Sequence, residues 1–393
     1  MAAFRRAGFL LAALVALMGA PSGTRAQNFQ TLAPQALLAD HETGAVLFEK
    51  GADDLVAPAS LAKIMTAELV FHEIKGGRLS LDSEFTVSEN AWRRGGSGSG
   101  GSAMFAQLNS RIKLSDLLLG LIVQSGNDAA ITLAEGVAGS EETFARLMTQ
   151  RAREIGLARS TFRNATGFAH PEQKVTAREL QLLAAHIIRT YPEFYPMFGQ
   201  REFTWNKIRQ QNRNPLLTMD IGADGLKTGN IDESGFGLVA SAVQNGQRLT
   251  LVVSGLKTAR DRAQEARKLL EWGFRAFEPR NLFEAGQPVG EAQVFGGAKG
   301  AVPLVARRPV RLLIPRGTAE RIQARIVYQG PLRAPVAAGA EVGRLRVTRG
   351  EVQALDLPLY AAEEVGVGSL SQRAVDALME LSAGLVRRAF TRS

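Results

Sequence analysis

Three short segments of the chain carry side chains suited to acyl transfer. Ser60–Lys63 (SLAK) places a hydroxyl and an amine three residues apart, Ser125–Asn127 (SGN) adds a hydroxyl and an amide, and Lys227–Gly229 (KTG) adds a second amine. Residues three apart lie on the same face of a helix, so the first hydroxyl and amine can touch. A serine hydroxyl becomes a strong nucleophile when an adjacent base takes its proton, and a neutral lysine can be that base. The three segments therefore predict a serine enzyme that forms a covalent intermediate.

Neither Ser-x-x-Lys nor Ser-x-Asn is specific alone, because the chain repeats both patterns. Ser110–Lys113 and Ser254–Lys257 match the first pattern, and Ser88–Asn90 matches the second. Ser60 differs from the other serines because it opens a predicted amphipathic helix over Leu61–Ile74. This context selects Ser60 as the nucleophile.

The alternative role for Ser60 and Lys63 is structural, as a helix cap and a surface lysine. A lysine in a first turn faces the positive end of the helix dipole, where an acid would be more stable, and this unfavourable placement indicates function. To act as a base near pH 7, Lys63 must lower its pKa by about three units from roughly 10.4, which costs about 4 kcal/mol. Burial supplies shifts of about 3–5 units, and a second cation, predicted to be Lys227, acts in the same direction.

Backbone groups are predicted to complete this site. The amide of Ser60 lies at a helix N-terminus, where N–H groups lack intrahelical partners, and we expect it to help bind an oxyanion. Gly229 is expected to let an extended peptide lie against its backbone. The alternatives are an exposed strand lysine at Lys227 and a turn at Gly229. The Gly95–Gly101 segment is either a plain flexible loop or part of the cleft lining, since glycine permits close backbone approach.

The elements that must position these residues form an α+β domain. Strands are predicted at Ala36–Asp40 and Ala45–Glu49, and again at Phe236–Val243 and Arg248–Gly255, where Asn245-Gly246 forms the turn. Between these pairs, apolar spacing predicts helices at Leu61–Ile74, Leu114–Ile122, Ala129–Val137, Glu141–Ile155 and Ala177–Ile188, and a closing helix follows at Asp261–Phe277. Strands at both ends with helices between them predict one antiparallel sheet with an inserted helical region.

The pattern of residue types along the sequence changes after Pro279. Short β-branched runs separated by glycine and proline predict a small all-β domain with strands at Val302–Ala306, Val310–Ile314, Ile322–Tyr328, Val342–Val347 and Val352–Leu357. The predicted organisation is a signal peptide at residues 1–26, a catalytic domain at 27–279, the all-β domain at 280–367 and an amphipathic helix at 368–393.

The N-terminus predicts export. Arg5 and Arg6 precede an uncharged stretch over Ala7–Ala20, and Thr24–Ala26 offers small residues for signal peptidase cleavage before Gln27. The alternative is a transmembrane helix, but the uncharged stretch is shorter than the roughly 20 residues that spanning requires. Cleavage removes three arginines and no acid, so the formal charge falls from +9 to +6.

The composition excludes several classes of function. The chain has no cysteine, which rules out a disulfide framework, a thiolate nucleophile and a zinc–thiolate site. The four histidines, His41, His72, His170 and His186, lack the i, i+4 spacing of a helical metal site and are predicted to be structural, so no metal or other cofactor is expected. The positive charge is scattered, and export favours an acidic membrane surface or wall polymer as the partner, with no nucleic acid.

The C-terminal residues place an apolar stripe along a predicted helix over Ser369–Phe390. Leu370, Leu378 and Leu385 belong to the stripe, while four arginines and two acids leave a charge of +2. So many charges exclude a membrane span but suit a helix lying in the interface of an anionic membrane. The alternative is a helix docked on its own protein.

In this order, the three segments resemble the signature of penicillin-binding proteins and class A β-lactamases. Ala57–Thr66, Gln124–Ala130 and Asp224–Gly229 are similar to the low-molecular-weight D-alanyl-D-alanine carboxypeptidases of the peptidase S11 family, and the likeness extends through the tail domain and the amphipathic C-terminus. The resemblance implies an enzyme that removes the terminal D-alanine from peptidoglycan stem peptides and is acylated by β-lactams. It also implies a periplasmic location with peripheral attachment to the outer face of the inner membrane.

The resemblance implies roles for the catalytic residues. Ser60 would be the acyl-ester nucleophile and Lys63 its proton acceptor. Ser125 and Lys227 would shuttle protons and orient the substrate.

It implies substrate-binding residues as well. Asn127 would hold the peptide backbone, and Thr228 with Arg262 would receive the terminal carboxylate. The backbone amide of Asn230 would be the second oxyanion donor. Family members commonly carry His-Thr after Lys-Thr-Gly, whereas this chain has Asn230 and Ile231, so a side-chain role at this position does not carry over.

Three other functions fit parts of the pattern. A D,D-endopeptidase would cleave cross-bridges with the same residues, and a β-lactamase would need a deacylating carboxylate that the sequence does not identify. A penicillin-binding wall scaffold without turnover is disfavoured by the intact Ser60, Lys63, Ser125, Asn127 and Lys227. Release of free D-alanine separates a carboxypeptidase from all three.

The apolar stripe generates a prediction about membrane binding. Replacing both Leu378 and Leu385 with Asp should release the protein from anionic vesicles, because interfacial binding scales with buried apolar area. Neutralising Arg387 and Arg388 should weaken binding in part and make it less sensitive to salt. D-alanine release from a soluble peptide should persist in both variants. Co-sedimentation with vesicles and a D-alanine assay on the same samples test this, and unchanged sedimentation of the double Asp variant would favour the docked helix.

Overall fold

A five-stranded antiparallel sheet joins the two ends of the region predicted to be the catalytic domain. The computed structural model describes residues 29–317, 322–349 and 352–374, and the sheet has the order β2-β1-β9-β8-β7. The strands are β1 (Gln35–Asp40), β2 (Val46–Lys50), β7 (Ala223–Ile231), β8 (Gly235–Gln244) and β9 (Gln247–Leu256). β1 pairs with β9, which confirms that the sheet is built from distant parts of the sequence. β7 carries the KTG segment at the edge of the sheet, so one side of this strand has no neighbouring strand in the sheet.

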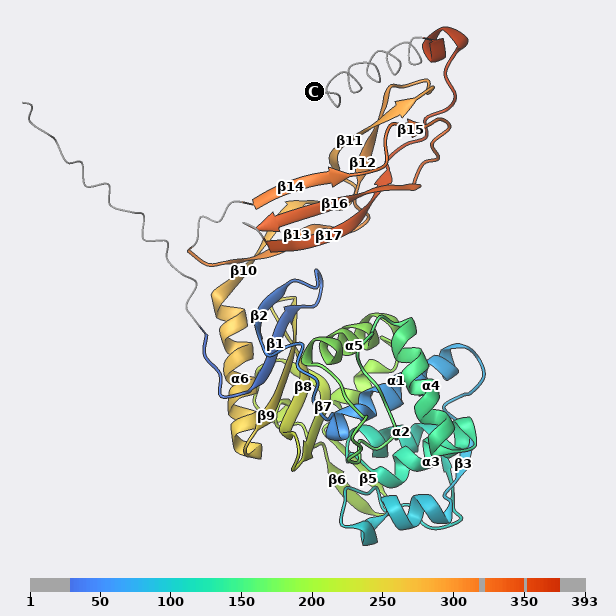
Figure 1. Cartoon of the computed structure of the whole chain (residues 1–393), viewed down its shortest axis with the longest axis vertical. Coiled ribbons are helices and arrows are strands. Elements are labelled where there is room, and N and C mark those ends of the chain that lie inside the picture. Colours follow the sequence, from blue (N-terminus) through green and yellow to red (C-terminus); the bar gives the residue numbers. More distant parts are fainter. Residues whose placement is uncertain (1–28, 318–321, 350–351, 375–393) are drawn as a thin grey trace, which may run out of the picture.

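Helices cover both faces of the sheet (Figure 1). The face opposite the other helices is covered by α6 (Ala259–Ala276), which packs on β8 and β9. The helices on the other side are α1 (Lys63–Lys75), α2 (Leu114–Ile122), α3 (Asn127–Ala138), α4 (Glu141–Glu154) and α5 (Ala177–Thr190). Alternate residues of β8 face the two cores, with Val239 packing toward the helical region and Leu238 toward α6. Short two-stranded ribbons complete this region: β3 (Glu84–Thr86) with β4 (Arg111–Lys113), and β5 (Glu202–Trp205) with β6 (Ile208–Gln211).

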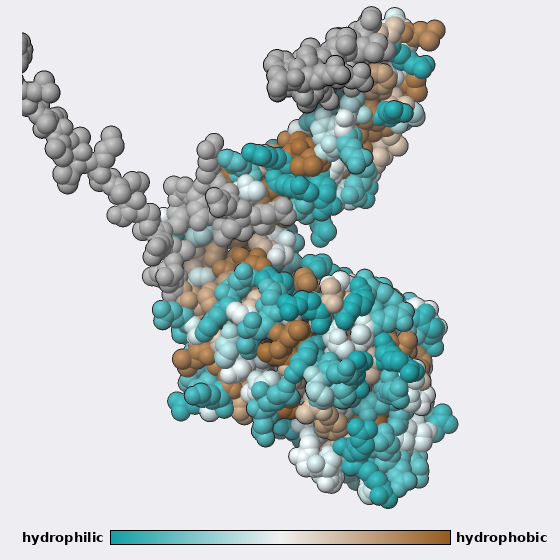
Figure 2. Space-filling model, viewed as in Figure 1, coloured by the Kyte–Doolittle hydropathy of each residue, from teal (hydrophilic) through white to brown (hydrophobic). Residues whose placement is uncertain are grey.

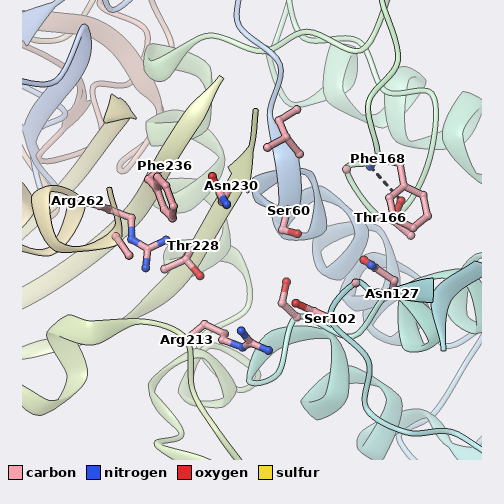
Figure 3. A pocket seen from close by; sticks show the side chains of 17 residues that line it. Ser60, Ser102, Asn127, Thr166, Phe168, Arg213, Thr228, Asn230, Phe236 and Arg262 are labelled. Atoms are coloured by element: carbon pink, nitrogen blue, oxygen red, sulfur yellow. Dashed lines mark hydrogen bonds between the residues drawn. The ribbon is translucent and has the colours of Figure 1, made fainter. Parts of the chain in front are cut away.

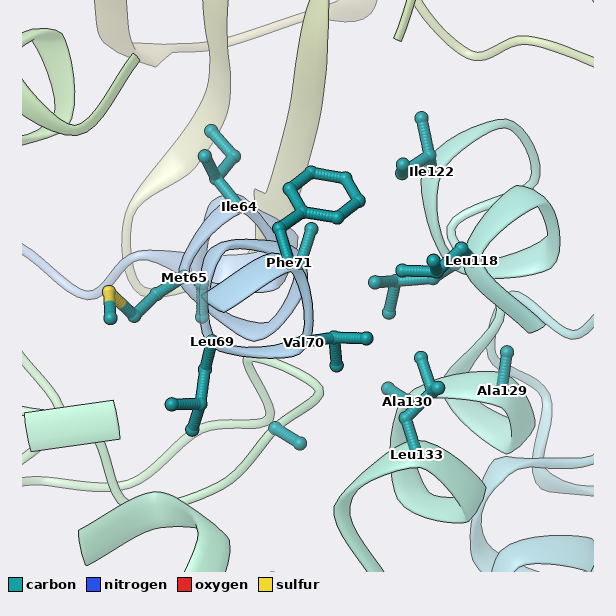
Figure 4. Packing of buried hydrophobic residues seen from close by; sticks show 14 of the residues in the cluster. Ile64, Met65, Leu69, Val70, Phe71, Leu118, Ile122, Ala129, Ala130 and Leu133 are labelled. Carbon is teal, nitrogen blue, oxygen red and sulfur yellow. The ribbon is translucent and has the colours of Figure 1, made fainter. Parts of the chain in front are cut away.

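The helix after Ser60 is buried on all sides, so the prediction that it is amphipathic was wrong. Ser60 itself lies in a 3-10 turn, η1 (Ala59–Ala62), and α1 begins at Lys63. All residues of α1 from Lys63 through Phe71 are buried. Figure 4 shows the cause: apolar side chains leave α1 in several directions, and α2 and α3 present Leu118 and Leu133 to it. A central helix of this kind holds the turn that contains Ser60 in a fixed position.

The remainder of the chain is built of strands. β10 (Phe277–Phe283) pairs with β13 (Val310–Pro315), and six further strands take the order β14-β16-β17-β12-β11-β15. These strands are β11 (Pro288–Phe295), β12 (Ala301–Val305), β14 (Ile322–Val327), β15 (Leu332–Arg333), β16 (Glu341–Arg349) and β17 (Val352–Ala361). They enclose a core of their own, separate from those of the catalytic region. The sequence did not predict β10, β11 and β15, since proline, glycine and polar residues interrupt their apolar pattern.

The two regions meet at a short junction (Figure 1). β10 follows α6 without an intervening loop, and Phe277 is buried in the core beneath α6 together with Leu313 of β13. Figure 2 shows a mainly hydrophilic surface over the helical region, with small and separate hydrophobic areas. Among the described residues, no helix combines the length and the apolar character needed to cross a membrane. The predicted signal peptide and residues 375–393 of the predicted C-terminal helix lie outside the described residues.

Candidate active site

A cleft of about 570 Å³ opens between β7 and the helical region. Seven of the predicted site residues line it: Ser60, Ser125, Asn127, Thr228, Gly229, Asn230 and Arg262. The other two, Lys63 and Lys227, are buried, with 1% and 2% of their surface exposed. Figure 3 shows Ser60 between two groups of side chains, with Arg262, Arg213 and Thr228 on one side and Asn127, Thr166 and Phe168 on the other.

The Lys63 amine contacts three oxygens. Its Nζ lies 3.1 Å from Ser60 Oγ, 2.8 Å from Asn127 Oδ1 and 2.6 Å from the backbone oxygen of Thr166. The amide and carbonyl oxygens can only accept hydrogen bonds, so they take two N–H groups of the amine. A neutral amine then keeps its lone pair for the serine hydroxyl, which can donate. The three contacts therefore fit an uncharged Lys63 that accepts from Ser60, and they fit equally an ammonium that donates to all three oxygens.

Burial also sets the charge of this amine. Removal from water lowers the pKa of Lys63 from its usual value to about 7, while the carboxylates of Asp128 and Glu141 oppose that shift. Burial likewise places the pKa of Lys227 well below its usual value, and the positive charges of Lys63, Arg213 and Arg262 add to the effect. The charge of Lys63 thus lowers the pKa of Lys227, whereas burial alone accounts for the low pKa of Lys63, so the effect of Lys227 on Lys63 stays a prediction.

Ser125 and Asn127 are positioned by an unusual turn and a buried carboxylate. Ser125 has φ +64°, in the left-handed region that non-glycine residues seldom adopt. The backbone N–H of Asn127 donates a hydrogen bond to the backbone oxygen of Ser102, with an N–O distance of 2.7 Å. Next to it, the buried Asp128 carboxylate accepts hydrogen bonds from the amides of Met104 and Ala129, and burial raises its pKa. Asp128 was not identified from the sequence, although an acid in the first turn of α3 was a usable signal.

The turn that contains Ser60 packs closely against Gly167. Ala59, directly before Ser60, has φ +49°, a second left-handed residue at the site. Gly167 has φ +86°, and a Cβ at this position would lie 1.8 Å from the backbone oxygen of Ala59. The same loop supplies the Thr166 oxygen that accepts from Lys63. Only glycine permits this close approach.

Two arginines gather at one end of the cleft. Arg262 projects from α6, and its Nε is buried without a hydrogen-bond partner among the described residues. Burial and the charge of Arg213 lower the pKa of Arg262, so the two guanidinium groups are close enough to repel. An anionic group bound between them and Thr228 would relieve this repulsion. Arg213 was missed from the sequence because it lies outside the three motifs.

Glycines bring the backbone segments of the cleft together. A Cβ at Gly229 would lie 3.0 Å from Leu61 Cγ and 3.1 Å from the backbone oxygen of Pro58. The position of the missing side chain faces the turn that contains Ser60. Glycine therefore lets β7 pack on that turn, which is a different reason for glycine from the one predicted. Gly100 and Gly101 line the cleft, so part of the Gly95–Gly101 segment belongs to its wall.

The repeated motifs take other positions. Ser110 is only half-buried beside β4, its hydroxyl donating to the Gln107 backbone, while Lys113 pairs with Asp82 on the surface. Ser254 is buried within β9, and Lys257 is exposed. Neither pair lines the cleft. Among the described residues, no histidine lines the cleft, and no group of three or more histidine, aspartate or glutamate residues is arranged to hold a metal ion.

Comparison with known families assigns both parts of the chain. Residues 22–258 match the family described as D-alanyl-D-alanine carboxypeptidase, peptidase S11. Residues 277–367 match the family described as penicillin-binding protein 5, C-terminal domain.

Individual relatives agree with these families. The D-alanyl-D-alanine carboxypeptidase DacC of Escherichia coli is 39% identical over 346 residues, which cover 87% of this chain and 86% of the relative. The crystal structure of penicillin binding protein 5 from Haemophilus influenzae superposes with a TM-score of 0.77 at 36% identity, covering 86% of this chain and 98% of that one. Penicillin-binding protein D2 from Listeria monocytogenes, in its ampicillin-bound form, has a TM-score of 0.54 at 30% identity and covers 63% of this chain and 99% of its own.

The contact between Gly167 and Ala59 generates a prediction. Gly167→Ala should slow acylation by a fluorescent penicillin about 100-fold, because a displacement of about 1 Å at a reacting group costs that much. Gly156→Ala is the matched control, since Gly156 also has positive φ (+89°) but nothing lies within 4 Å of its added Cβ. Acylation rates for both variants, with thermal unfolding measured in parallel, test this. Equal losses in the two variants would contradict it.

Proposed function

Because the chain belongs to the D-alanyl-D-alanine carboxypeptidase family, peptidase S11, we propose that it removes terminal D-alanine through an acyl-enzyme on Ser60. Membership makes the protein a hydrolase that acts on peptidoglycan and interacts with β-lactams. The observation that carries the proposal is the 3.1 Å contact between Ser60 Oγ and the buried Lys63 amine. Nucleophile and base are in hydrogen-bond reach, which is the geometry that covalent catalysis requires.

The first half of the reaction uses the neutral lysine. Lys63 takes the hydroxyl proton as Ser60 Oγ attacks the carbonyl carbon between the two D-alanines, and the carbonyl oxygen becomes an oxyanion. The amides of Ser60 and Asn230 stabilise that charge. The carbon–nitrogen bond then breaks, and the proton that Lys63 took passes through the Ser125 hydroxyl to the leaving D-alanine amine, with Lys227 orienting this relay. Lys63 is then neutral again. Ser125 and Lys227 are both buried, and Ser125 lines the cleft.

Substrate orientation comes from the two ends of the cleft. The terminal carboxylate lies at Thr228, Arg262 and Arg213, where the paired positive charges have no acidic partner in the cleft lining. Asn127 holds the peptide backbone on the acyl side, with its oxygen turned to Lys63. In the second half of the reaction, Lys63 takes a proton from a water molecule that attacks the Ser60 ester. Lys63 then returns this proton to Ser60 Oγ as the shortened peptide leaves.

The domain organisation and location are part of the same proposal. The catalytic domain spans residues 27–279 after removal of a signal peptide at 1–26, and an all-β domain spans 280–367. The family matches at 22–258 and 277–367 support this division. Relatives that act on the cell wall support a periplasmic location. The apolar stripe and the charge of +2 in residues 368–393 support peripheral attachment to an anionic membrane surface.

Replacement of the nucleophile tests the proposal directly. Ser60→Ala should abolish both covalent labelling by penicillin and release of D-alanine from a pentapeptide, since the ester cannot form without the hydroxyl. Ser110→Ala and Ser254→Ala should leave both signals unchanged, because neither residue lines the cleft. Labelling that follows Ser110 or Ser254 would show that the nucleophile is misassigned.

The pKa of Lys63 predicts the pH dependence of acylation. Below its pKa of about 7 the amine is protonated and cannot accept the serine proton, so the rate should fall roughly tenfold per pH unit. Above that value the rate should level off, because the amine is already neutral. Second-order rate constants for penicillin acylation from about pH 5 to about pH 9 measure this.

Lys63→Arg provides the control for the pH profile. Arginine keeps the positive charge but does not deprotonate in this range, so acylation should collapse at every pH. Near-normal acylation by this variant, or a flat profile through pH 7 for the unmodified enzyme, would place the base elsewhere.

A further inference from the structure

A second cavity, of about 650 Å³, adjoins the catalytic cleft at the end of β7. Asn230, Ile231 and Phe236 line both spaces, so the two are adjacent. The far wall is the segment Leu55–Ala57, which leads directly into the turn that contains Ser60. None of the catalytic steps described above uses this cavity.

The direction of the bound peptide leads into this space. The terminal carboxylate is placed at Thr228, and Asn230 and Ile231 come after Thr228 on β7. A chain that lies along the free edge of β7 from the carboxylate end therefore passes Asn230 and then reaches Ile231. The second cavity opens at that point, on the acyl side of the reacting bond.

The lining of this cavity combines apolar walls with an ion pair at the rim. Leu55, Val56 and Ile231 provide apolar surface. Lys174 Nζ donates to Glu233 Oε1 at 2.6 Å, which links the residues before α5 to the turn between β7 and β8. Both side chains line the cavity, and they are 29% and 48% exposed.

The backbone on either side of the ion pair is fixed. Lys174 exchanges two backbone hydrogen bonds with Thr161, and Val175 exchanges two with Val56. The ion pair itself is easy to open, since partly exposed pairs contribute only about 0–1 kcal/mol. A ligand group that carries both an ammonium and a carboxylate can replace each partner in turn, pairing its carboxylate with Lys174 and its ammonium with Glu233. Such an exchange leaves no charge unpaired, whereas a single ammonium would leave Lys174 without a partner.

We propose that this cavity binds the side chain of the stem-peptide residue that precedes the two D-alanines, and that Lys174 and Glu233 select a side chain ending in both an ammonium and a carboxylate. The inference rests on the proposed carboxypeptidase function. The apolar walls suit the methylene groups of such a side chain, and the ion pair suits its charged end. The enzyme would thereby distinguish stem peptides by their diamino acid.

Three pentapeptides that differ only at this residue test the proposal. The residue is meso-diaminopimelate, with an ammonium and a carboxylate, or lysine, with an ammonium alone, or norleucine, with neither. Release of D-alanine gives kcat/KM for each peptide with the full-length enzyme and with Lys174→Gln and Glu233→Gln. Lys299→Gln is the matched control, because Lys299 forms a similar ion pair with Glu363 at 2.7 Å in the all-β part of the chain.

The expected result is a selective loss. Lys174→Gln should lower kcat/KM for the diaminopimelate peptide about tenfold and leave the norleucine peptide within about twofold, the size of one lost charge-assisted contact. Glu233→Gln should lower kcat/KM for both ammonium-bearing peptides, and Lys299→Gln should change none.

Three outcomes would overturn the proposal. Unchanged ratios among the peptides would show that the cavity does not bind this side chain. Equal losses on all three, norleucine included, would assign Lys174 and Glu233 to the shape of the cleft. Absence of D-alanine release from every peptide by the unmodified enzyme would instead refute the carboxypeptidase function itself.

Discussion

Lys63 sits in the first turn of α1 with its amine removed from water, where an ammonium group would cost several kcal/mol. That cost lowers the pKa of the amine to about 7, so a neutral amine that can accept the Ser60 proton is present near that pH. The surrounding structure maintains it: α1 is buried on every side, and β7 closes the site from the edge of the sheet. Asp128 and Glu141 act against the shift and hold the pKa at about 7. The reactivity of the hydroxyl is thus a property of the core.

Two residues at this site adopt backbone conformations that are unfavourable for residues other than glycine. Ala59 and Ser125 both adopt positive φ beside the two serine hydroxyls. Left-handed non-glycine residues cost of order 1–3 kcal/mol each, and they persist only where packing determines them. Gly167 provides that packing on one side through its contact with the Ala59 carbonyl. Ala59 and Ser125 therefore lower the free energy of unfolding, and both lie at the proposed catalytic site.

Much of the site could be predicted because most of its residues belong to short motifs of neighbouring residues. Each of the three motifs is a run of three or four residues that can be found without knowledge of the fold, and α2 spans Leu114–Ile122 as the apolar spacing predicted. Arg213 and Gly167 could not be found in this way, since each acts through a contact with a segment distant in sequence. The buried character of α1 was misjudged for a similar reason. Apolar spacing shows one buried face, whereas Glu68, buried in the structure, makes the other face look exposed in the sequence.

The junction between α6 and β10 has a consequence for orientation. α6 carries Arg262 near its start, is 18 residues or roughly 27 Å long, and passes into β10 without a loop. Phe277 is anchored in the core at this point, and the amide of Arg316 bonds the Ala276 carbonyl across it. No loop therefore separates α6 from β10 at which the two parts of the chain could bend. Binding of the all-β part to another structure would therefore also fix the direction in which the cleft opens.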